Sequence, residues 1–371
     1  MADVSAATGL SKATVSKALN GREDIAATTR ERVLAAVAEL GYRSTTAPDV
    51  TSIRRVLTVV FDLPTSSYIM GVLDGVLGGA SERGVDLLMR LAPDLESRRR
   101  HAVAREWVED QRAAGVRGIV GLTLSQPGAL ISAARDADIP FVMVDPVDTN
   151  HKRVLSIGSN NWAGARAATA HLIGLGHRRI AWIGGPDASD AARDRLYGYR
   201  AALDTAGIEV DPHLVRSGPF DAAQGALHAR ELLTAPHPPT AIMAADDELA
   251  IGALATARIL GIRVPEELSI MGFDDTSQAA WTTPPLTTVH QHLGGMGRMA
   301  VEAVLAMADG HRPATSHIEL ATSLTLRDST SVAPPKPGVT PSGTPTEEPS
   351  MRCTLPSNGC NRLGRSSGVG D

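Results

Sequence analysis

Short runs of apolar residues alternate with amphipathic helical patterns over most of the chain, from about residue 53 to residue 328. Val56–Phe61 is a continuous apolar run of the kind that forms a buried strand, and Tyr68–Arg83 repeats apolar residues at helical spacing. The same reasoning predicts further strands at Asp86–Met89, Gly118–Leu122, Pro140–Val144, Ile180–Ile183, Ala241–Ala244 and Leu268–Gly272. It predicts further helices at Trp162–Leu175, Asp190–Ala206, Ala222–Leu233 and Glu248–Leu260.

This alternation indicates an α/β fold. Helices of such length between successive strands imply parallel sheets that are covered on both faces. The pattern restarts after Ser156, which predicts two doubly wound parallel-sheet subdomains. In sheets of this kind ligands bind beyond the carboxyl ends of the strands, so we expect a cleft between the subdomains.

Residues 1–44 follow a different pattern, that of short helices joined by tight turns. The run DVSAATGLSKATVSKALN, residues 3–20, has the spacing of a helix-turn-helix unit. Val4 and Ala7 give its first helix an apolar face. Gly9 supplies the positive φ that the turn needs, and Ser11 is a natural N-cap for the second helix. We therefore predict an all-α unit at the amino terminus.

The second helix of this unit has a polar and basic outward face. Its outward and flanking positions are Lys12, Ala13, Thr14, Ser16, Lys17 and Asn20. Such residues suit the major groove of DNA, where lysine reaches guanine acceptors and small apolar groups meet the thymine methyl. On this pattern alone, a small helical bundle with an ordinary solvated face is the alternative.

Length and composition narrow the class of protein further. A chain of 371 residues with 43% hydrophobic residues and a net charge of -5 is long enough for two or three domains. No apolar stretch reaches the roughly 20 residues of a membrane span, and no signal peptide is evident, so we expect a cytoplasmic protein. The cysteines, Cys353 and Cys360, lie in a Pro-, Gly- and Ser-rich segment that we expect to be disordered.

Several sequence runs resemble one family of bacterial transcriptional regulators. GLSKATVSKALNG followed by TTRERVLAAVAELGYR is similar to the headpiece of the lactose/galactose repressor (LacI/GalR) family. Further matching runs, in order, are HLIGLGHRRIAWIGGP, RLYGYRAAL, PPTAIMAADDELAIGAL, RVPEELSIMGFDD and PPLTTVHQ. The resemblance extends to about Asp328. It implies a DNA-binding headpiece, a hinge and an effector-binding core of the periplasmic-binding-protein type.

The resemblance suggests domain limits. Residues 1–44 correspond to the headpiece, 45–55 to the hinge, 56–328 to the core and 329–371 to a disordered tail. The first subdomain of the core is expected at about 56–156 and 291–317, and the second at about 157–290 and 318–328.

The resemblance also assigns contacts to DNA. Base readout falls on Lys12, Ala13 and Lys17, and contacts to phosphate and sugar fall on Thr14, Ser16 and Asn20. Lys17 stands where the family often has arginine, so a bidentate guanine contact becomes a point contact. The hinge lacks the family's Ala-Arg-x-x-Leu pattern, and either Val50 or Ile53 replaces the leucine that enters the minor groove, or the segment is a plain linker.

The expected effector site lies at strand ends that face the cleft. Its predicted residues are Asp145, Arg195, Phe220, Asp246, Asp274 and Gln291, with Trp162, Trp281 and Tyr68 as weaker candidates for an aromatic wall. Carboxylates, an arginine and a glutamine exchange hydrogen bonds with adjacent hydroxyls, which favours a saccharide. An extended or acidic ligand stays open because arginine pairs equally well with a carboxylate. Asp247 and Asp275 are interpreted as helix caps.

Other chemistry finds no support in the sequence. The dinucleotide-like run Gly295–Ala300 is read as a chance match inside a packed helix, and His290 and His292 lack further metal ligands at suitable spacing. We therefore predict no cofactor, no metal and no enzymatic activity. The predicted protein is a homodimeric repressor that binds double-stranded operator DNA and responds to a small molecule. The alternative is a saccharide-binding protein of the same core fold without a DNA function.

Overall fold

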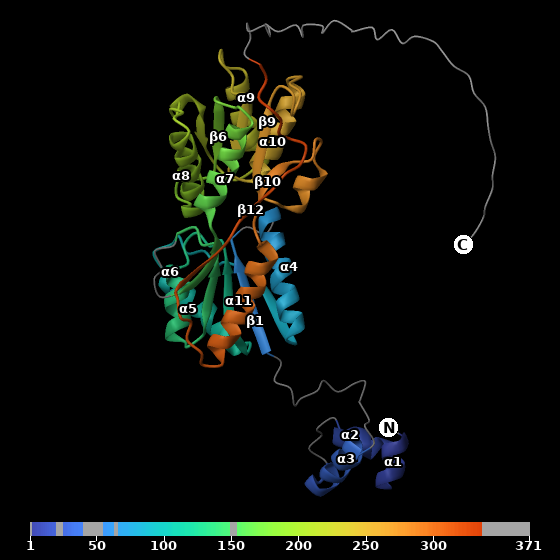
Figure 1. Ribbon diagram of the computed structural model, residues 1–371. Coiled ribbons are helices and arrows are strands. Elements are labelled where there is room, and N and C mark those ends of the chain that lie inside the picture. The colour runs from blue at the N-terminus through green and yellow to red at the C-terminus, as the bar shows by residue number, and fades with distance from the viewer. Residues whose placement is uncertain (1, 20–24, 40–54, 63–65, 149–153, 336–371) are drawn as a thin grey trace, which may run out of the picture. The chain divides into compact units, whose positions relative to one another are not determined.

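The computed structural model describes residues 2–19, 25–39, 55–62, 66–148 and 154–335. Within these ranges the amino-terminal unit consists of three helices, α1 (Ala2–Thr8), α2 (Lys12–Leu19) and α3 (Ala27–Glu39), shown at the blue end of the chain in Figure 1. Asn20, the predicted hinge positions Val50 and Ile53, and residues 336–371 lie outside the described residues.

A small apolar core holds the three helices together. Val4, Val15 and Val33 are fully buried in it, one from each helix. Ala7, which the sequence pattern assigned to this core, is exposed, and Ala18 of α2 is buried instead. The turn follows the prediction: Gly9 has a φ of +66°, and the Ser11 Oγ accepts a hydrogen bond from the Thr14 amide at 3.1 Å.

The remainder folds into two subdomains, each with one six-stranded sheet covered by helices on both faces (Figure 1). The strand order is β11-β5-β4-β3-β1-β2 in the first sheet and β12-β10-β9-β8-β6-β7 in the second. All pairings are parallel except that of β12 with β10, so the predicted α/β class is confirmed. The strands of the first sheet are β1 (Arg55–Phe61), β2 (Val85–Leu91), β3 (Val116–Leu122), β4 (Phe141–Val144), β5 (Leu155–Ser159) and β11 (His317–Leu320). Those of the second are β6 (Ile180–Gly184), β7 (Val215–Ser217), β8 (Ala241–Ala244), β9 (Ser269–Asp274), β10 (Thr287–His290) and β12 (Ser323–Thr325).

Pairs of helices cover the faces of the two sheets. In the first subdomain α4 (Ser67–Glu82) and α11 (Leu293–Ala308) pack on one face, and α5 (Arg100–Ala113) and α6 (Gly128–Asp136) on the other. The second subdomain pairs α7 (Asn161–Gly174) with α8 (Asp190–Thr205), and α9 (Ala222–Leu233) with α10 (Asp247–Ile259). Short 3-10 turns at Pro212–Leu214 and Ser277–Trp281 complete the second subdomain.

Glycine allows α4 and α11 to touch through their backbones. A Cβ on Gly75 would lie 1.9 Å from the Gly294 carbonyl oxygen, and one on Gly297 would lie 2.1 Å from the Val72 carbonyl oxygen. The dinucleotide-like run Gly295–Ala300 therefore lies in the amino-terminal half of α11 and packs on α4, as the sequence interpretation held.

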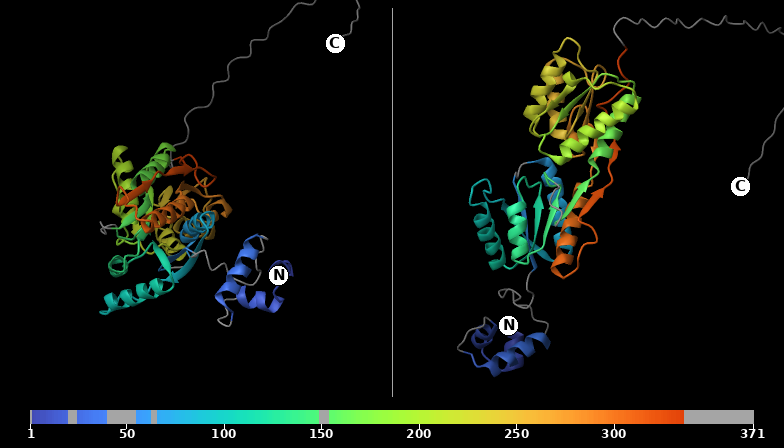
Figure 2. Two further views of the ribbon diagram at one scale, coloured as in Figure 1. Left: turned by 90° about the horizontal axis from the view of Figure 1, so that it is seen from below. Right: turned by 90° about the vertical axis from the view of Figure 1, so that its left-hand side faces the viewer.

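The chain crosses between the subdomains after β5, after β10 and after β11 (Figure 2). The predicted boundaries at residues 156 and 317 are therefore too early, because β5 and β11 both belong to the first sheet. Short, partly polar strands such as β11 carry no clear apolar run, which explains why the sequence pattern did not reveal them.

The predicted start of the tail is also wrong. Ser329 is fully buried, and its Oγ donates to the Ile270 carbonyl at 2.6 Å. The Ala333 amide donates to the Leu175 carbonyl at 2.8 Å, so the chain after residue 329 first packs on the second subdomain. In the described part of the chain, no helix combines the length and the apolar character that crossing a bilayer requires.

Candidate ligand cleft and nucleic-acid interface

A cavity of about 670 Å³ lies between the two subdomains, at the carboxyl ends of their strands. Five of the six residues predicted for the effector site line it: Asp145, Arg195, Phe220, Asp246 and Asp274. They come from segments that are far apart in the sequence, so the strand-end rule located a common site. Their contact with a ligand stays a prediction.

Arg195 of α8 is held rigidly at the cavity wall. The residue is 3% exposed, its Nε donates to the Asn161 Oδ1 at 2.7 Å, and its Nη1 donates to the Ala245 carbonyl at 2.7 Å. The guanidinium carbon lies 3.9 Å from the centre of the Phe273 ring. Nη2 makes no hydrogen bond with any described residue, so the fixed guanidinium keeps one donor group for a ligand.

Asp274 pairs with Arg195 and is positioned by Gln291. The Asp274 Oδ1 lies 3.3 Å from the Arg195 Nη1 and accepts a hydrogen bond from the Gln291 Nε2 at 2.5 Å. Gln291 is 1% exposed, does not line the cavity and orients Asp274, so its contact with a ligand stays a prediction. Asp274 itself has a φ of +110°, a strained conformation of a kind that concentrates at functional sites.

Burial shifts the carboxyl groups of the cleft toward the protonated form. Asp246 caps α10 by accepting a hydrogen bond from the Leu249 amide at 2.7 Å, and burial raises the pKa of Asp246 to about 7. Desolvation by burial also raises the pKa values of Asp145 and Asp274, although Arg195 opposes both shifts.

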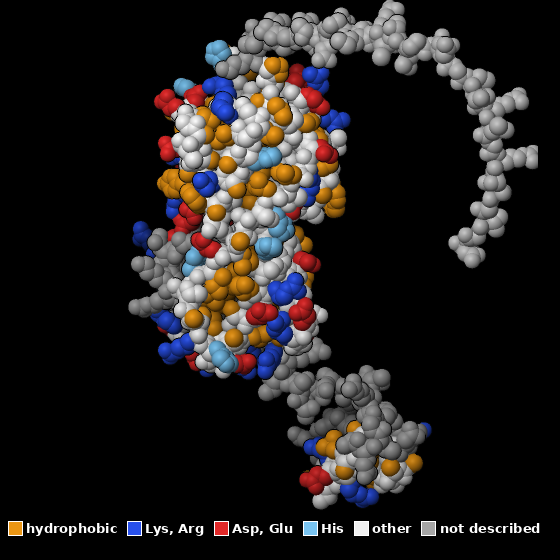
Figure 3. Space-filling model, in the orientation of Figure 1, with side chains coloured by type: hydrophobic (Ala, Val, Ile, Leu, Met, Phe, Trp, Pro, Cys, Tyr) orange, Lys and Arg blue, Asp and Glu red, His pale blue; other side chains and the backbone are white. Residues whose placement is uncertain are grey.

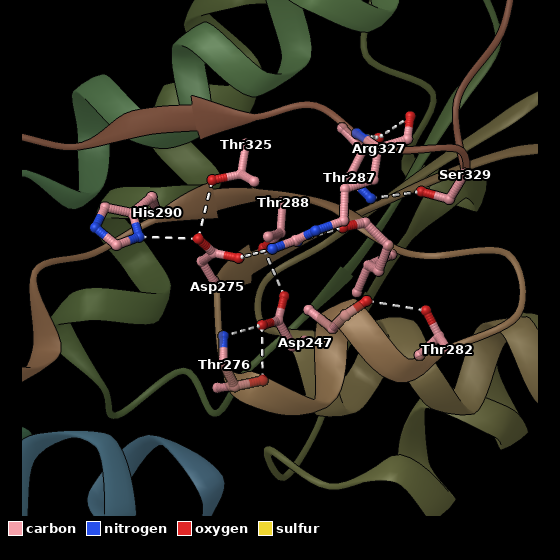
Figure 4. A network of polar contacts seen from close by, with 12 residues as sticks. Asp247, Asp275, Thr276, Thr282, Thr287, Thr288, His290, Thr325, Arg327 and Ser329 are labelled. Atoms are coloured by element: carbon pink, nitrogen blue, oxygen red, sulfur yellow. Dashed lines mark hydrogen bonds and ion pairs between the residues drawn. The ribbon is translucent and has the colours of Figure 1, made fainter. Parts of the chain in front are cut away.

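Two further aspartates lie behind the cleft in the network of Figure 4. The Asp247 Oδ1 accepts from the Thr288 Oγ1 at 2.5 Å, and its Oδ2 accepts from the Thr276 amide at 2.7 Å. The interpretation of Asp247 as the helix cap is thus wrong: Asp246 caps α10, and Asp247 ties β10 to the segment after β9. Burial raises the pKa of Asp247 to about 6 despite these hydrogen bonds.

Asp275 links segments next to the crossings. Its Oδ1 accepts from the Arg327 Nη2 at 2.6 Å, while its Oδ2 accepts from the Thr325 Oγ1 at 2.9 Å and lies 2.9 Å from the His290 Nδ1 (Figure 4). Burial opposes ionisation, but these hydrogen bonds hold the pKa of Asp275 below its ordinary value. Asp275 therefore joins the end of β10 to β12 and does not cap a helix.

Hydrogen bonds also connect the subdomains directly across the cleft. The Glu248 Oε1, from the first turn of α10, accepts from the Ser67 amide at the start of α4 at 3.1 Å. On the other side the Asp190 amide donates to the Val147 carbonyl at 2.9 Å. These two contacts hold the subdomains together around the cavity.

Sequence reasoning missed some lining residues and misplaced some aromatic ones. Asp62 and Glu248 line the cavity, and Asp62 obeys the same strand-end rule because it directly follows β1. Tyr68, one of the weaker aromatic candidates, lines it as well, and burial together with the neighbouring Asp145 raises the pKa of its hydroxyl. Trp162 and Trp281 do not line the cavity, and their side chains are 43% and 79% exposed.

The predicted base-reading residues share one face of α2. Lys12, Ala13 and Lys17 are exposed, whereas Thr14 and Ser16 are half-buried. The Thr14 Oγ1 lies 2.9 Å from the Ser11 Oγ at the start of the helix. The geometry of the second helix of a helix-turn-helix unit is therefore present, with a basic face and a firm N-cap.

A helix-turn-helix unit joined to a two-subdomain ligand cleft defines the class of ligand-responsive DNA-binding regulators. Residues 1–44 match the family model described as bacterial regulatory proteins, lacI family, and residues 169–330 match the periplasmic binding protein-like domain. The chain is 33% identical to the HTH-type transcriptional regulator CelR of Thermobifida fusca, over 88% of this chain and 96% of that protein. It is 32% identical to MalR of Streptomyces coelicolor, over 91% of this chain and 98% of that protein.

Solved structures of similar proteins indicate the same family as the sequence relatives do. A CelR–cellobiose complex superposes with a TM-score of 0.66 at 32% identity, covering 88% of this chain and 98% of that one. The lac repressor dimer bound to operator and the anti-inducer ONPF gives a TM-score of 0.68 at 26% identity, covering 89% of this chain and 98% of that one. The chain belongs to the lacI family of bacterial regulatory proteins and is a DNA-binding transcriptional regulator.

The contact between Glu248 and Ser67 generates a first prediction. Glu248→Ala removes the acceptor, so amide hydrogen exchange at Ser67 should accelerate by about fivefold, because one half-exposed hydrogen bond contributes about 1 kcal/mol. Exchange is measured by mass spectrometry on peptides that contain Ser67. Glu248→Gln keeps an acceptor oxygen, so the Ser67 amide should exchange at the same rate in this variant as in the unmodified chain. Equal exchange rates in all three proteins would contradict a stabilising contact.

The buried carboxyl groups generate a second prediction. Between about pH 4 and pH 7 the folded chain retains a proton on Asp246 that the unfolded chain has lost, so the free energy of unfolding falls as pH rises. Asp246→Asn keeps a capping oxygen without the titration and should reduce this fall by an amount on the order of 2 kcal/mol. Urea denaturation at pH 5 and pH 7.5 measures the difference. Exposed Asp204→Asn is the control, and an unchanged pH dependence in Asp246→Asn would refute the assignment.

Proposed function

We propose that this regulator is a repressor and that an uncharged saccharide in the cleft controls its affinity for an operator. The ligand class is inferred from one observation. Arg195 pairs with Asp274 inside a cavity whose other charged lining residues are all aspartates and glutamates. The guanidinium already has Asp274 beside it, and the residues that line the cavity offer an acidic ligand no second cation. The acidic ligand that the sequence left open is therefore disfavoured.

The carboxylates leave acceptor atoms for hydroxyl groups. Asp246 uses its Oδ1 for the Leu249 amide, and Glu248 uses its Oε1 for the Ser67 amide. The second oxygen of each carboxylate accepts no hydrogen bond from a described residue. A ligand rich in hydroxyl donors fits such acceptors, and Phe220 offers an apolar surface for its C–H groups. The relative crystallised as a CelR–cellobiose complex supports the same ligand class.

Operator recognition is proposed for α2. Lys12, Ala13 and Lys17 contact base edges in the major groove, and Thr14 and Ser16 contact the DNA backbone. The exposure of the first three on one helix face supports these roles. Asn20 is assigned to the backbone on the family resemblance alone.

A homodimer on a pseudo-palindromic operator is part of the proposal. Large apolar side chains are exposed on α4 and β2 of the first subdomain, namely Met70, Leu77, Met89 and Leu91. Figure 3 shows hydrophobic side chains gathered on one face of this subdomain, the lower half of the core in that view. Grouped apolar residues mark interaction surfaces, and the lac repressor, a relative of known structure, is a dimer on its operator. The alternative of a saccharide-binding protein without a DNA function does not fit membership of this family.

The cleft proposal predicts the behaviour of Arg195→Lys. An ammonium cannot reproduce the simultaneous contacts to Asn161, Ala245 and a ligand, so saccharide affinity should fall by about tenfold or more while operator binding changes less than about twofold. Titration calorimetry and gel shifts measure the two affinities. Arg193→Lys, on the exposed side of the same helix, is the matched control, and unchanged saccharide binding in Arg195→Lys would remove Arg195 from the site.

The operator proposal predicts the behaviour of Lys17→Ala. Losing one base contact should weaken specific operator binding by roughly 1–3 kcal/mol. Fluorescence anisotropy on operator and scrambled duplexes measures the specificity ratio, which should fall. Arg105→Ala removes one positive charge from the exposed surface of α5, far along the chain from α2, and should leave the specificity ratio unchanged. An equal loss on both duplexes would reassign Lys17 to the DNA backbone.

A further inference from the structure

A second hollow of about 260 Å³ adjoins the ligand cleft on the first subdomain. The segment of residues 92–96, which follows β2, and the segment of residues 124–127, which follows β3, form its walls. Asp62 and Ser125 line both this hollow and the main cavity, so these two residues form the boundary between the two spaces. A ligand that fills the cleft has an adjacent space into which it can extend.

The junction between the two spaces is fixed by hydrogen bonds. The Asp62 Oδ2 accepts from the Ser125 amide at 2.8 Å and from the Ser125 Oγ at 2.6 Å. Asp62 follows β1 and Ser125 follows β3, and these strands are neighbours in the sheet. The Asp62 Oδ1 accepts no hydrogen bond from a described residue, so it is an acceptor for a group that passes between the two spaces.

The hollow combines an apolar floor with a polar rim. Leu95, Leu124 and Leu130 are buried members of the apolar cluster below it. Asp94 is exposed at the rim, where its Oδ1 accepts from the Glu96 amide at 3.0 Å and its Oδ2 has no hydrogen bond with a described residue. A sugar ring has the matching composition, with apolar C–H faces and donor hydroxyls at its edge.

The charge of the hollow restricts its occupant. Its charged lining residues are Asp62, Asp94 and Glu96, with no arginine, lysine or histidine. A phosphorylated or acidic extension would be repelled by these carboxylates, whereas hydroxyl groups donate to them. The occupant is therefore an uncharged continuation of the ligand in the cleft.

We propose that this hollow binds a further sugar unit of the effector, which is thus an oligosaccharide that runs from Arg195 past Asp62 to Asp94. This inference rests on the proposed saccharide function of the cleft. Asp94 and the floor leucines contribute to affinity only when the ligand is long enough to reach them.

Titration calorimetry on the full chain tests the inference with glucose and its α-1,4- and β-1,4-linked oligomers of two to four units. In the unmodified chain, affinity should rise by about tenfold at one added unit in at least one series. Ala92→Phe, which fills the hollow, and Asp94→Ala, which removes a rim acceptor, should each abolish most of that rise. Both should leave the affinity for the next shorter oligomer within about twofold. Glu109→Ala, which removes an exposed carboxylate from α5, is the matched control.

The outcomes separate this inference from the function on which it rests. If oligomers bind but affinity does not depend on length, or the length dependence survives in both variants, the second subsite is wrong and the cleft site stands. If no member of either series binds, the proposed saccharide function of the cleft fails and the inference fails with it. Arg195→Lys should weaken every member alike, which identifies binding that passes through the cleft.

Discussion

The buried ion pair between Arg195 and Asp274 is the interaction on which the cleft depends. Several carboxyl groups are brought together at the carboxyl ends of the strands, and placing them away from water costs several kcal/mol for each charge. One guanidinium offsets part of that cost for Asp274, while Asp246 retains a proton near neutral pH because its pKa rises to about 7. Arg195 is itself held by Asn161 and the Ala245 carbonyl, so the site is organised before any ligand arrives.

Adjacent aspartates at the end of β9 have separate structural tasks. Asp274 faces the cavity and pairs with Arg195, whereas Asp275 bonds Arg327 and Thr325 and lies against His290 beside the crossings. A displacement at one residue therefore reaches the other through a single peptide bond. The two aspartates thus link the wall of the ligand cavity to the segments that cross between the subdomains.

The sequence predicted the parts of the fold that repeat one pattern over many residues. Buried strands such as β8 and amphipathic helices such as α9 were located with the bounds that the structure has. The strand-end rule then brought Asp145, Asp246 and Asp274 to one cavity. The strand-end rule does not reveal a role that depends on a tertiary partner, because the sequence does not display that partner. Gln291 follows a strand as a ligand-binding residue would, yet its side chain is directed at Asp274.

Short and irregular segments escaped prediction for a related reason. β11 and β12 have few apolar residues, and they are strands only because β5 and β10 lie alongside them. Ser329 looks like the start of a polar tail, but its hydroxyl bridges the Ile270 carbonyl and the Thr287 amide inside the second subdomain. In each case the partner that satisfies the backbone comes from a distant part of the chain, and no local pattern encodes it.

The contacts of α4 explain how the cleft is connected to the rest of the first subdomain. Glu248 bonds the backbone at the start of α4, and the glycine contacts between α4 and α11 leave no room for these helices to slide separately. α11 in turn begins directly after the crossing that carries His290 and Gln291. The hydrogen bond at Ser67 therefore joins the second subdomain to a closely packed helix pair, α4 with α11. The same pair receives a second input through Gln291, which is bonded to Asp274 at the ligand cavity. Hydrogen bonds from Glu248 and from Gln291 thus connect the ligand cavity to the beginnings of the same helix pair.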